Sequence, residues 1–403
     1  MRIIRTLPFY LFLIYPVFGY FTINFLGFPP FYILSVLVGL SFSNMVLEKR
    51  KLKFPIYLLF YLLFTFSAII SKYIVNDLPL RFDSNLSEII FLISALLFFL
   101  IIESNILSFT FIRTSIRIMK YLVFTAAIVT IIQYFIPAFF VYAEKYTGAV
   151  ADISIYERRI VSIFSWGDLM FDSYMAIGFV IMYGILIVEY RNNRTMLILL
   201  PILAAIVTVL SLMRVAMLTF LISTFILVYK KISVKTIMNI AITLLAFYLL
   251  FYYLDFDVWI FSEARLESET ALTRIEAFSA FFYAFPEHIL WGTGGERTLA
   301  LFRGFGRIAR LHNAHLSIAY YYGLFAIIFH TLFIIFLTKS TFNTGKEANY
   351  WPPFVGMLCY IAATMTMPRG DFFEPGLIFL IIFNKYYYDQ YLIKKQIGYE
   401  NIS

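Results

Sequence analysis

Residues 54–74 read FPIYLLFYLLFTFSAIISKYI, and this stretch decides the class of fold. Its one charged residue is Lys72, close to its end, and a helix needs about 20 such apolar residues to cross the hydrocarbon core of a bilayer. The rest of the chain has the same character, since 62% of its 403 residues are hydrophobic, only 14% are charged, and the mean hydropathy is +0.84. The sequence therefore predicts an all-α, polytopic membrane protein.

About twelve apolar stretches are predicted as transmembrane helices. They lie near residues 7–25, 30–47, 54–74, 88–103, 118–140, 168–189, 195–211, 215–229, 236–254, 315–337, 351–367 and 373–391. The first is too long for the core of a signal peptide and no small-residue cleavage site follows it, so we expect it to be retained. With no sequence repeat and no soluble domain, residues 1–403 are expected to form a single integral-membrane domain with outer loops at about 141–167 and 255–314.

The basic residues of the short loops predict the orientation of the chain. With both termini in the cytoplasm, the loops at 48–53, 113–120, 191–194, 230–235 and 339–346 and the tail at 394–395 all lie inside. This orientation leaves only Lys72 and Lys145 among the lysines outside, in agreement with the excess of basic residues that short cytoplasmic loops carry. The single cysteine, Cys359, lies in an apolar stretch and excludes both a disulfide and a cysteine metal site.

The long outer segment from Asp255 to Leu311 contains arginine but no lysine. Its six arginines are Arg265, Arg274, Arg297, Arg303, Arg307 and Arg310. Topology does not require them, whereas the planar, bidentate guanidinium is favoured where phosphate must be held. Three of them, Arg303, Arg307 and Arg310, have the spacing of one stripe on a helix predicted from Glu296 to His315; a surface helix lying on anionic headgroups would explain that stripe equally well.

The net charge of +8 does not indicate a nucleic-acid partner. Acidic residues of the long outer segment balance its arginines, and the inner basic residues are the ordinary topological signal. A second outer loop carries the pair Arg158 and Arg159. We therefore expect the partners of this chain to be membrane lipids and a phosphorylated substrate.

Two short segments between apolar stretches are further candidates for phosphate contact. Ser211-Leu212-Met213-Arg214 connects two apolar stretches that are joined almost without a loop. Inserting an arginine at the centre of the bilayer costs about 2.5–3.5 kcal/mol. We expect Arg214 to face a cavity or the substrate; the alternative is that it snorkels to the outer headgroups. The turn from Trp291 to Gly295 has backbone amides that could approach a phosphate, although it lacks the strand–turn–helix context of a nucleotide-binding loop.

Two histidines, His312 and His315, stand at the start of the apolar stretch 315–337. Three residues apart, they would share one face of a helix, and an imidazole can take a proton from an attacking sugar hydroxyl. The alternative is an interfacial polar cap; zinc is disfavoured, because no third ligand has a matching spacing. His288 lies in a polar loop, and for His330, inside an apolar stretch, we expect a structural role.

The order of four motifs resembles the O-antigen polymerase and O-antigen ligase superfamily of bacterial envelopes. The motifs are Ser211-Leu212-Met213-Arg214; Thr273-Arg274-Ile275-Glu276; Leu290-Trp291-Gly292-Thr293-Gly294; and His312-Asn313, followed after nine residues by Gly323-Leu324-Phe325-Ala326. The resemblance covers about residues 160–330 as motifs and the remaining chain only as layout.

This resemblance implies an inverting, metal-independent glycosyltransferase of the integral-membrane class C type, with no cofactor. Its donor would be an undecaprenyl-diphosphate-linked oligosaccharide at the outer face of the bacterial inner membrane. Arg214 and Arg274 would hold the diphosphate, and His312 would be the base. Further substrate contacts are expected from Arg158, Arg159, Arg297, Arg303, Arg307, Arg310, Asn313 and His315, and the sequence leaves open whether a chain-length regulator protein binds.

Within this superfamily the sequence favours a polymerase. The ligase signature ends in Gly-x-x-Gly, and Ala326 replaces its last glycine here. Two arginine-bearing outer loops suit an enzyme of lipopolysaccharide biosynthesis that joins two diphosphate-linked chains. A ligase that transfers the glycan to lipid A-core is the alternative. A lipid-linked oligosaccharide flippase or transporter is a weaker one, because the pseudo-symmetry and the correspondingly broken helices of transporters are not evident.

Overall fold

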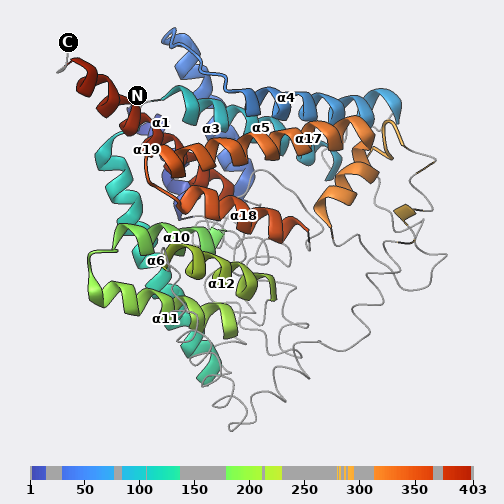
Figure 1. Ribbon diagram of the computed structural model, residues 1–403. Coiled ribbons are helices and arrows are strands. Elements are labelled where there is room, and N and C mark those ends of the chain that lie inside the picture. The colour runs from blue at the N-terminus through green and yellow to red at the C-terminus, as the bar shows by residue number, and fades with distance from the viewer. Residues whose placement is uncertain are drawn as a thin grey trace.

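The computed structural model describes residues 2–14, 30–76, 84–105, 107–136, 178–210, 214–228, 279, 281–282, 286, 289–294, 313–365 and 375–400. Every regular element within these ranges is a helix (Figure 1). The all-α prediction is therefore confirmed for the described part of the chain.

The helices overlap all but one of the predicted apolar stretches; the exception, 236–254, lies outside the described residues. In chain order they are α1 (Arg2–Leu13), α3 (Pro30–Leu47), α4 (Ile56–Ile69), the π-helix η2 (Ile70–Val75), α5 (Ser84–Ser104), α6 (Phe109–Phe135), α10 (Val180–Glu189), α11 (Arg194–Leu210), α12 (Arg214–Val228), α17 (Ala314–Glu347), α18 (Pro352–Thr364) and α19 (Pro375–Glu400).

Three helical segments among the described residues are long and apolar enough to cross a membrane, namely Ile56–Val75, Phe109–Phe135 and Ala314–Glu347. These segments indicate a membrane protein. Six other apolar helical segments among the described residues are shorter, with 10–17 residues each. The predicted number of about twelve spans is therefore not confirmed.

Aromatic side chains join α4 to α17 along most of the length of α4. Phe60 stacks on Phe336 with ring centroids 5.1 Å apart, and Phe64 lies 5.6 Å from the ring of His330. The positions in contact rise along α4 as they fall along α17, so the two helices are antiparallel, as Figure 1 shows at the top of the molecule. Burying such rings against each other is worth about 0.5–1.5 kcal/mol a pair beyond the area they remove from the surface.

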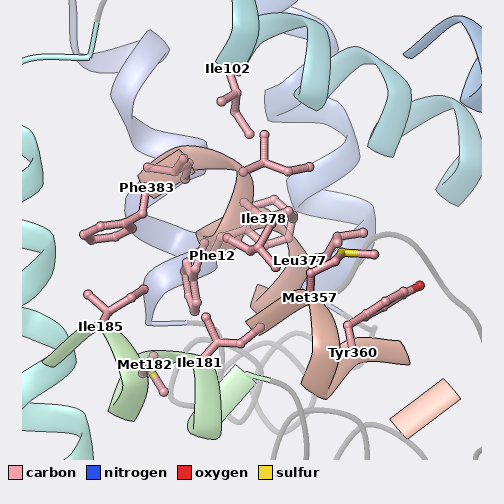
Figure 2. Packing of buried hydrophobic residues seen from close by; sticks show 14 of the residues in the cluster. Phe12, Ile102, Ile181, Met182, Ile185, Met357, Tyr360, Leu377, Ile378 and Phe383 are labelled. Atoms are coloured by element: carbon pink, nitrogen blue, oxygen red, sulfur yellow. The ribbon is translucent and has the colours of Figure 1, made fainter. Parts of the chain in front are cut away.

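A second cluster of buried residues surrounds α19. Seven consecutive residues of that helix, from Leu377 to Phe383, are buried, and a helix that is apolar and covered on all sides occupies the interior of a bundle. Figure 2 shows its side chains packed with Phe12 of α1, Ile181 of α10 and Met357 of α18. This cluster ties α1, α10, α18 and α19 together.

The bundle has two ends with different polar contacts. At one end, Tyr57 donates to Glu103 at 2.7 Å, and Tyr387 donates to Glu189. We call this the Glu189 end. Because α4 begins at this end and runs away from it, Ser71, which follows α4, lies at the opposite end together with Tyr321 of α17. Of the segments that match the motifs, the two that the structure describes, 290–294 and 313–326, meet at that opposite end.

Candidate functional site

Helix α17 is folded back on itself at Gly323. This residue has φ 83° and ψ −172°, a combination essentially restricted to glycine. The rings of His315 and His330, on either side of it, have centroids 5.2 Å apart, whereas 15 residues of straight helix would separate them by about 22 Å. The helix therefore consists of a short arm, residues 314–322, and a long arm, residues 324–347, which Figure 1 shows meeting at a sharp bend.

The prediction of one uninterrupted helix over residues 315–337 is therefore wrong at Gly323. An isolated glycine inside an apolar stretch is usually accommodated by a helix at a cost of about 1 kcal/mol, so composition alone does not reveal the bend. The long arm remains long enough to cross the bilayer, because its 24 residues (324–347) extend about 36 Å.

The segment 289–294 fills the bend of α17. The backbone amides of Thr293 and Gly294 donate to the carbonyls of Tyr320 and Tyr321 at 3.0 and 2.8 Å, and Leu324 donates to the carbonyl of Ile289 at 2.8 Å. Backbone groups freed by a broken helix must find partners, above all in a membrane, where water cannot replace them. The turn supplies these partners. Its amides at Thr293 and Gly294 therefore close the bend, and the prediction that they approach a phosphate is wrong for these two groups.

Two glycines allow the turn and the bend to approach backbone to backbone. Gly292 has φ 67°, and a Cβ built on it would lie 2.5 Å from the carbonyl carbon of Tyr321. At Gly323 a Cβ would lie 2.2 Å from the carbonyl oxygen of Leu290. Real Cβ atoms do not approach other atoms so closely, so both positions require glycine. Gly292 and Gly323 belong to two different sequence motifs, and the structure brings these motifs together.

The π-helix η2 holds the turn from its other side. Ser71 Oγ contacts the carbonyl of Trp291 and lies 3.2 Å from that of Tyr321, while Asn76 Nδ2 donates to the carbonyl of Gly292 at 3.2 Å. One-turn π-helices frequently accompany functional sites. Neither Ser71 nor Asn76 is predictable as a contact of the turn, because local sequence patterns contain no signal for contacts that span more than 200 residues.

Lys72 of η2 follows Ser71, which contacts the turn. The basic loops predict this lysine on the outer side, which stays a prediction, and its side chain is fully buried within the bundle. A lysine with no exposed surface is rare in proteins. Its burial shows that η2 is packed into the bundle next to the turn.

Asn313 begins the short arm of α17. Its backbone is extended (φ −153°, ψ 117°), its Oδ1 accepts from the amide of Leu316 at 3.0 Å, and its Nδ2 donates to the carbonyl of Met365 at 3.2 Å. This is the geometry of an N-cap. The helix predicted from Glu296 to His315 therefore does not continue through Asn313. His312 precedes the helix, so the predicted helical face shared by His312 and His315 is wrong.

His315 belongs to the short arm of α17 and faces both the long arm and the end of α18. It is half-buried, and its Nε2 is 3.3 Å from Oγ1 of Thr364, the last residue of α18. Its ring packs against the fully buried ring of His330, which in turn contacts Phe64. The bend of α17 thus brings two imidazoles and a hydroxyl together close to the turn.

Most of the other predicted site residues lie outside the described residues. These are Arg158, Arg159, Arg274, Arg297, Arg303, Arg307, Arg310 and His312. Arg214 is the first residue of α12, but its side chain is not among those that the structure describes. The contacts predicted for these residues, and the substrate contacts predicted for Asn313 and His315, stay predictions. Among the described side chains, no group of three or more His, Cys, Asp or Glu is placed to hold a metal ion.

Comparison of the chain with protein-family models gave no match, and comparison with curated protein sequences gave none either. The functional interpretation therefore depends on the motifs themselves, on the way the turn and the bend meet, and on the chemistry of the side chains beside them.

Proposed function

We propose that this chain is an O-antigen (surface polysaccharide) polymerase. It would join undecaprenyl-diphosphate-linked oligosaccharide repeat units within the bacterial inner membrane. The observation that carries the proposal is the meeting of two motif segments, 289–294 and 313–326, at the bend of α17. Their glycines are required by this contact, which gives a physical reason for the presence of both motifs in one chain.

The proposed arrangement in the membrane follows from the basic loops. Both termini would be cytoplasmic, about twelve helices would span the inner membrane as in class C glycosyltransferases, and the Glu189 end would face the cytoplasm. The bend of α17, at the opposite end, would then face the outer leaflet. A diphosphate attached to a membrane-embedded polyprenyl chain lies at that same depth, so the donor would reach the bend without leaving the bilayer.

The proposed reaction is a displacement at the anomeric carbon of the donor. A hydroxyl of the acceptor glycan forms a bond to that carbon from the side opposite the diphosphate, and the bond from carbon to the diphosphate oxygen breaks. Undecaprenyl diphosphate leaves with the electron pair, so the configuration is inverted. Arg214 and Arg274 would neutralise the charge that develops on it, and their bidentate hydrogen bonds would orient it.

An imidazole near the start of α17 would take the proton of the acceptor hydroxyl, a task for which histidine is suited near neutral pH. The motif position assigns this task to His312. The remaining arginines, Arg158 and Arg159 on one outer loop and Arg297, Arg303, Arg307 and Arg310 on the other, would contact the two diphosphate-linked chains. The mechanism needs no metal, because guanidinium groups supply the positive charge.

Reconstitution of the purified protein in liposomes with a lipid-linked repeat unit as the only substrate tests this proposal. A polymerase converts the repeat unit into a ladder of longer lipid-linked chains and releases undecaprenyl diphosphate. If glycan is transferred only after lipid A-core is added, the protein is a ligase and the polymerase assignment is wrong. If no transfer occurs with either acceptor, the proposed class of enzyme is wrong.

A further inference from the structure

The contacts of Thr364 determine which nitrogen of His315 carries a hydrogen. Thr364 is buried, and its Oγ1 has two polar neighbours: the carbonyl oxygen of Ile361 at 2.9 Å and Nε2 of His315 at 3.3 Å. A hydroxyl has one hydrogen to donate, and a carbonyl oxygen can only accept. If Thr364 donated to His315 instead, lone pairs of two oxygens would face each other at 2.9 Å. Both contacts are satisfied only when Thr364 donates to Ile361 and accepts from His315.

This arrangement leaves the lone pair of His315 on Nδ1. A neutral imidazole has one N–H and one bare nitrogen, so an Nε2–H that donates to Thr364 means that Nδ1 is the nitrogen able to accept a proton. The ring is also held in place, because it packs against His330 of the long arm, with the ring planes at 46°. His315 is thus oriented by α18 through a hydrogen bond and by α17 through ring packing.

We infer that His315 is the base of the reaction, that Nδ1 is the atom that accepts the proton, and that Thr364 is the residue that positions this imidazole and selects its tautomer. The inference rests on the proposed function. It moves the role of base from His312, which its motif position favours, to His315. The reason is that the rigid contacts described above hold His315, whereas His312 precedes the cap of the helix.

The proton transfer balances as follows. As the acceptor oxygen bonds to the anomeric carbon, its hydrogen passes to Nδ1 of His315, and undecaprenyl diphosphate leaves with the electrons of the broken bond. The imidazolium that results has a hydrogen on each nitrogen, and the Nε2–H still donates to Thr364. Loss of the Nδ1 proton to water then restores the starting tautomer, with no change in the contacts of Thr364.

Nitrogen NMR of histidine-labelled protein in detergent micelles tests the tautomer without any substrate. The chain has 4 histidines, and the spectrum of the His315→Gln variant identifies the signals of His315 by their loss. In a neutral imidazole the bare nitrogen resonates far downfield of the nitrogen that carries hydrogen. We expect Nδ1 of His315 to be the bare one. A spectrum in which Nε2 is bare would overturn the inference.

Variants of Thr364 test its role as a positioning residue. Thr364→Val keeps the shape but removes the acceptor, so the Nε2–H form of His315 should lose population, and the rate of glycan transfer should fall about 3-fold to 10-fold, the equivalent of one hydrogen bond. Thr364→Ser should restore both the tautomer and the rate. The matched control is Thr341→Val, since buried Thr341 makes the same bond to a carbonyl three residues earlier, also at 2.9 Å. Equal effects of the two valine variants would mean that Thr364 is merely structural.

The variant His315→Gln tests the base itself. The glutamine amide can still donate to Thr364 but cannot accept the proton, so we expect the fold to be kept and the rate of transfer to fall about 10²-fold to 10⁴-fold, more than in His312→Gln. If wild-type protein elongates lipid-linked repeat units and His315→Gln does so at the same rate, this inference fails and the proposed function stands. If the wild type transfers no glycan, the proposed function fails, and the NMR spectra still decide the role of Thr364.

Discussion

Replacing Gly323 with alanine should destabilise the protein severely. Two separate costs arise at this position. The backbone angles of Gly323 belong to a region that other residues occupy only at a cost of about 1–3 kcal/mol. In addition, the new methyl group would lie 2.2 Å from the carbonyl oxygen of Leu290 and 2.5 Å from the amide nitrogen of Trp291. Overpacking of this kind costs about another 1–3 kcal/mol, and backbone atoms cannot move aside as a flexible side chain can.

The sum of about 2–6 kcal/mol is a large part of the 5–15 kcal/mol that typically separates folded from unfolded protein. The assay is thermal unfolding of the purified variant in detergent, followed by circular dichroism. Gly39→Ala is the matched control, because nothing lies within 4 Å of a Cβ at Gly39 and it is in the interior of α3, where alanine is favoured over glycine by about 0.5–1 kcal/mol. If Gly323→Ala unfolds at the same temperature as Gly39→Ala, the bend and its contact with the turn are wrong.

Three further predictions concern the proposed site. Arg274→Lys should lose most of the transfer activity although it keeps the charge, because an ammonium cannot reproduce the bidentate contact of guanidinium with a diphosphate. Arg113→Lys, at an exposed position of α6, is the control and should keep full activity in the same assay. If Arg274→Lys is fully active, Arg274 serves membrane topology and does not bind the diphosphate. Asn313→Ala should lower the unfolding temperature more than Ser108→Ala. Each change removes an N-cap worth about 1 kcal/mol, but Asn313 also donates a hydrogen bond to the carbonyl of Met365. A larger decrease in unfolding temperature for Ser108→Ala would contradict the contribution of this contact between the start of α17 and the end of α18. Treatment with a chelator should leave the rate of glycan transfer unchanged, because the proposed mechanism depends on arginine alone for positive charge, and a loss that added Mg²⁺ reverses would refute it.

The helical character of the chain follows readily from its sequence. A continuous apolar run such as 54–74 can satisfy all its backbone hydrogen bonds within a membrane by forming a helix, and α4 with η2 lies where that run predicts it. The ends of helices are also encoded locally, as at Ser108, which caps α6.

The candidate site was only partly predictable, because it depends on contacts between distant segments. The motifs drew attention to the turn at 290–294 and to Gly323, but nothing in their sequences indicates that the turn closes a broken helix. The bend has its cause in the backbone angles of Gly323 and in partners supplied by Thr293 and Gly294. For the same reason Thr364, which contacts His315 across 49 residues, could not be recognised without the fold.

Locating the bound donor tests the proposed function most directly. A polyprenyl-diphosphate-linked glycan with a photoreactive group next to the diphosphate would be cross-linked to the protein in liposomes, and the labelled peptides would be identified by mass spectrometry. We expect labelling to concentrate on the turn at 289–294 and on the short arm of α17, residues 314–322, and an unlabelled lipid-linked repeat unit to abolish it by competition. If the labelling that the competitor abolishes is confined to the Glu189 end, on peptides that contain Glu103 or Tyr387, the donor does not bind at the bend and the proposed site is wrong.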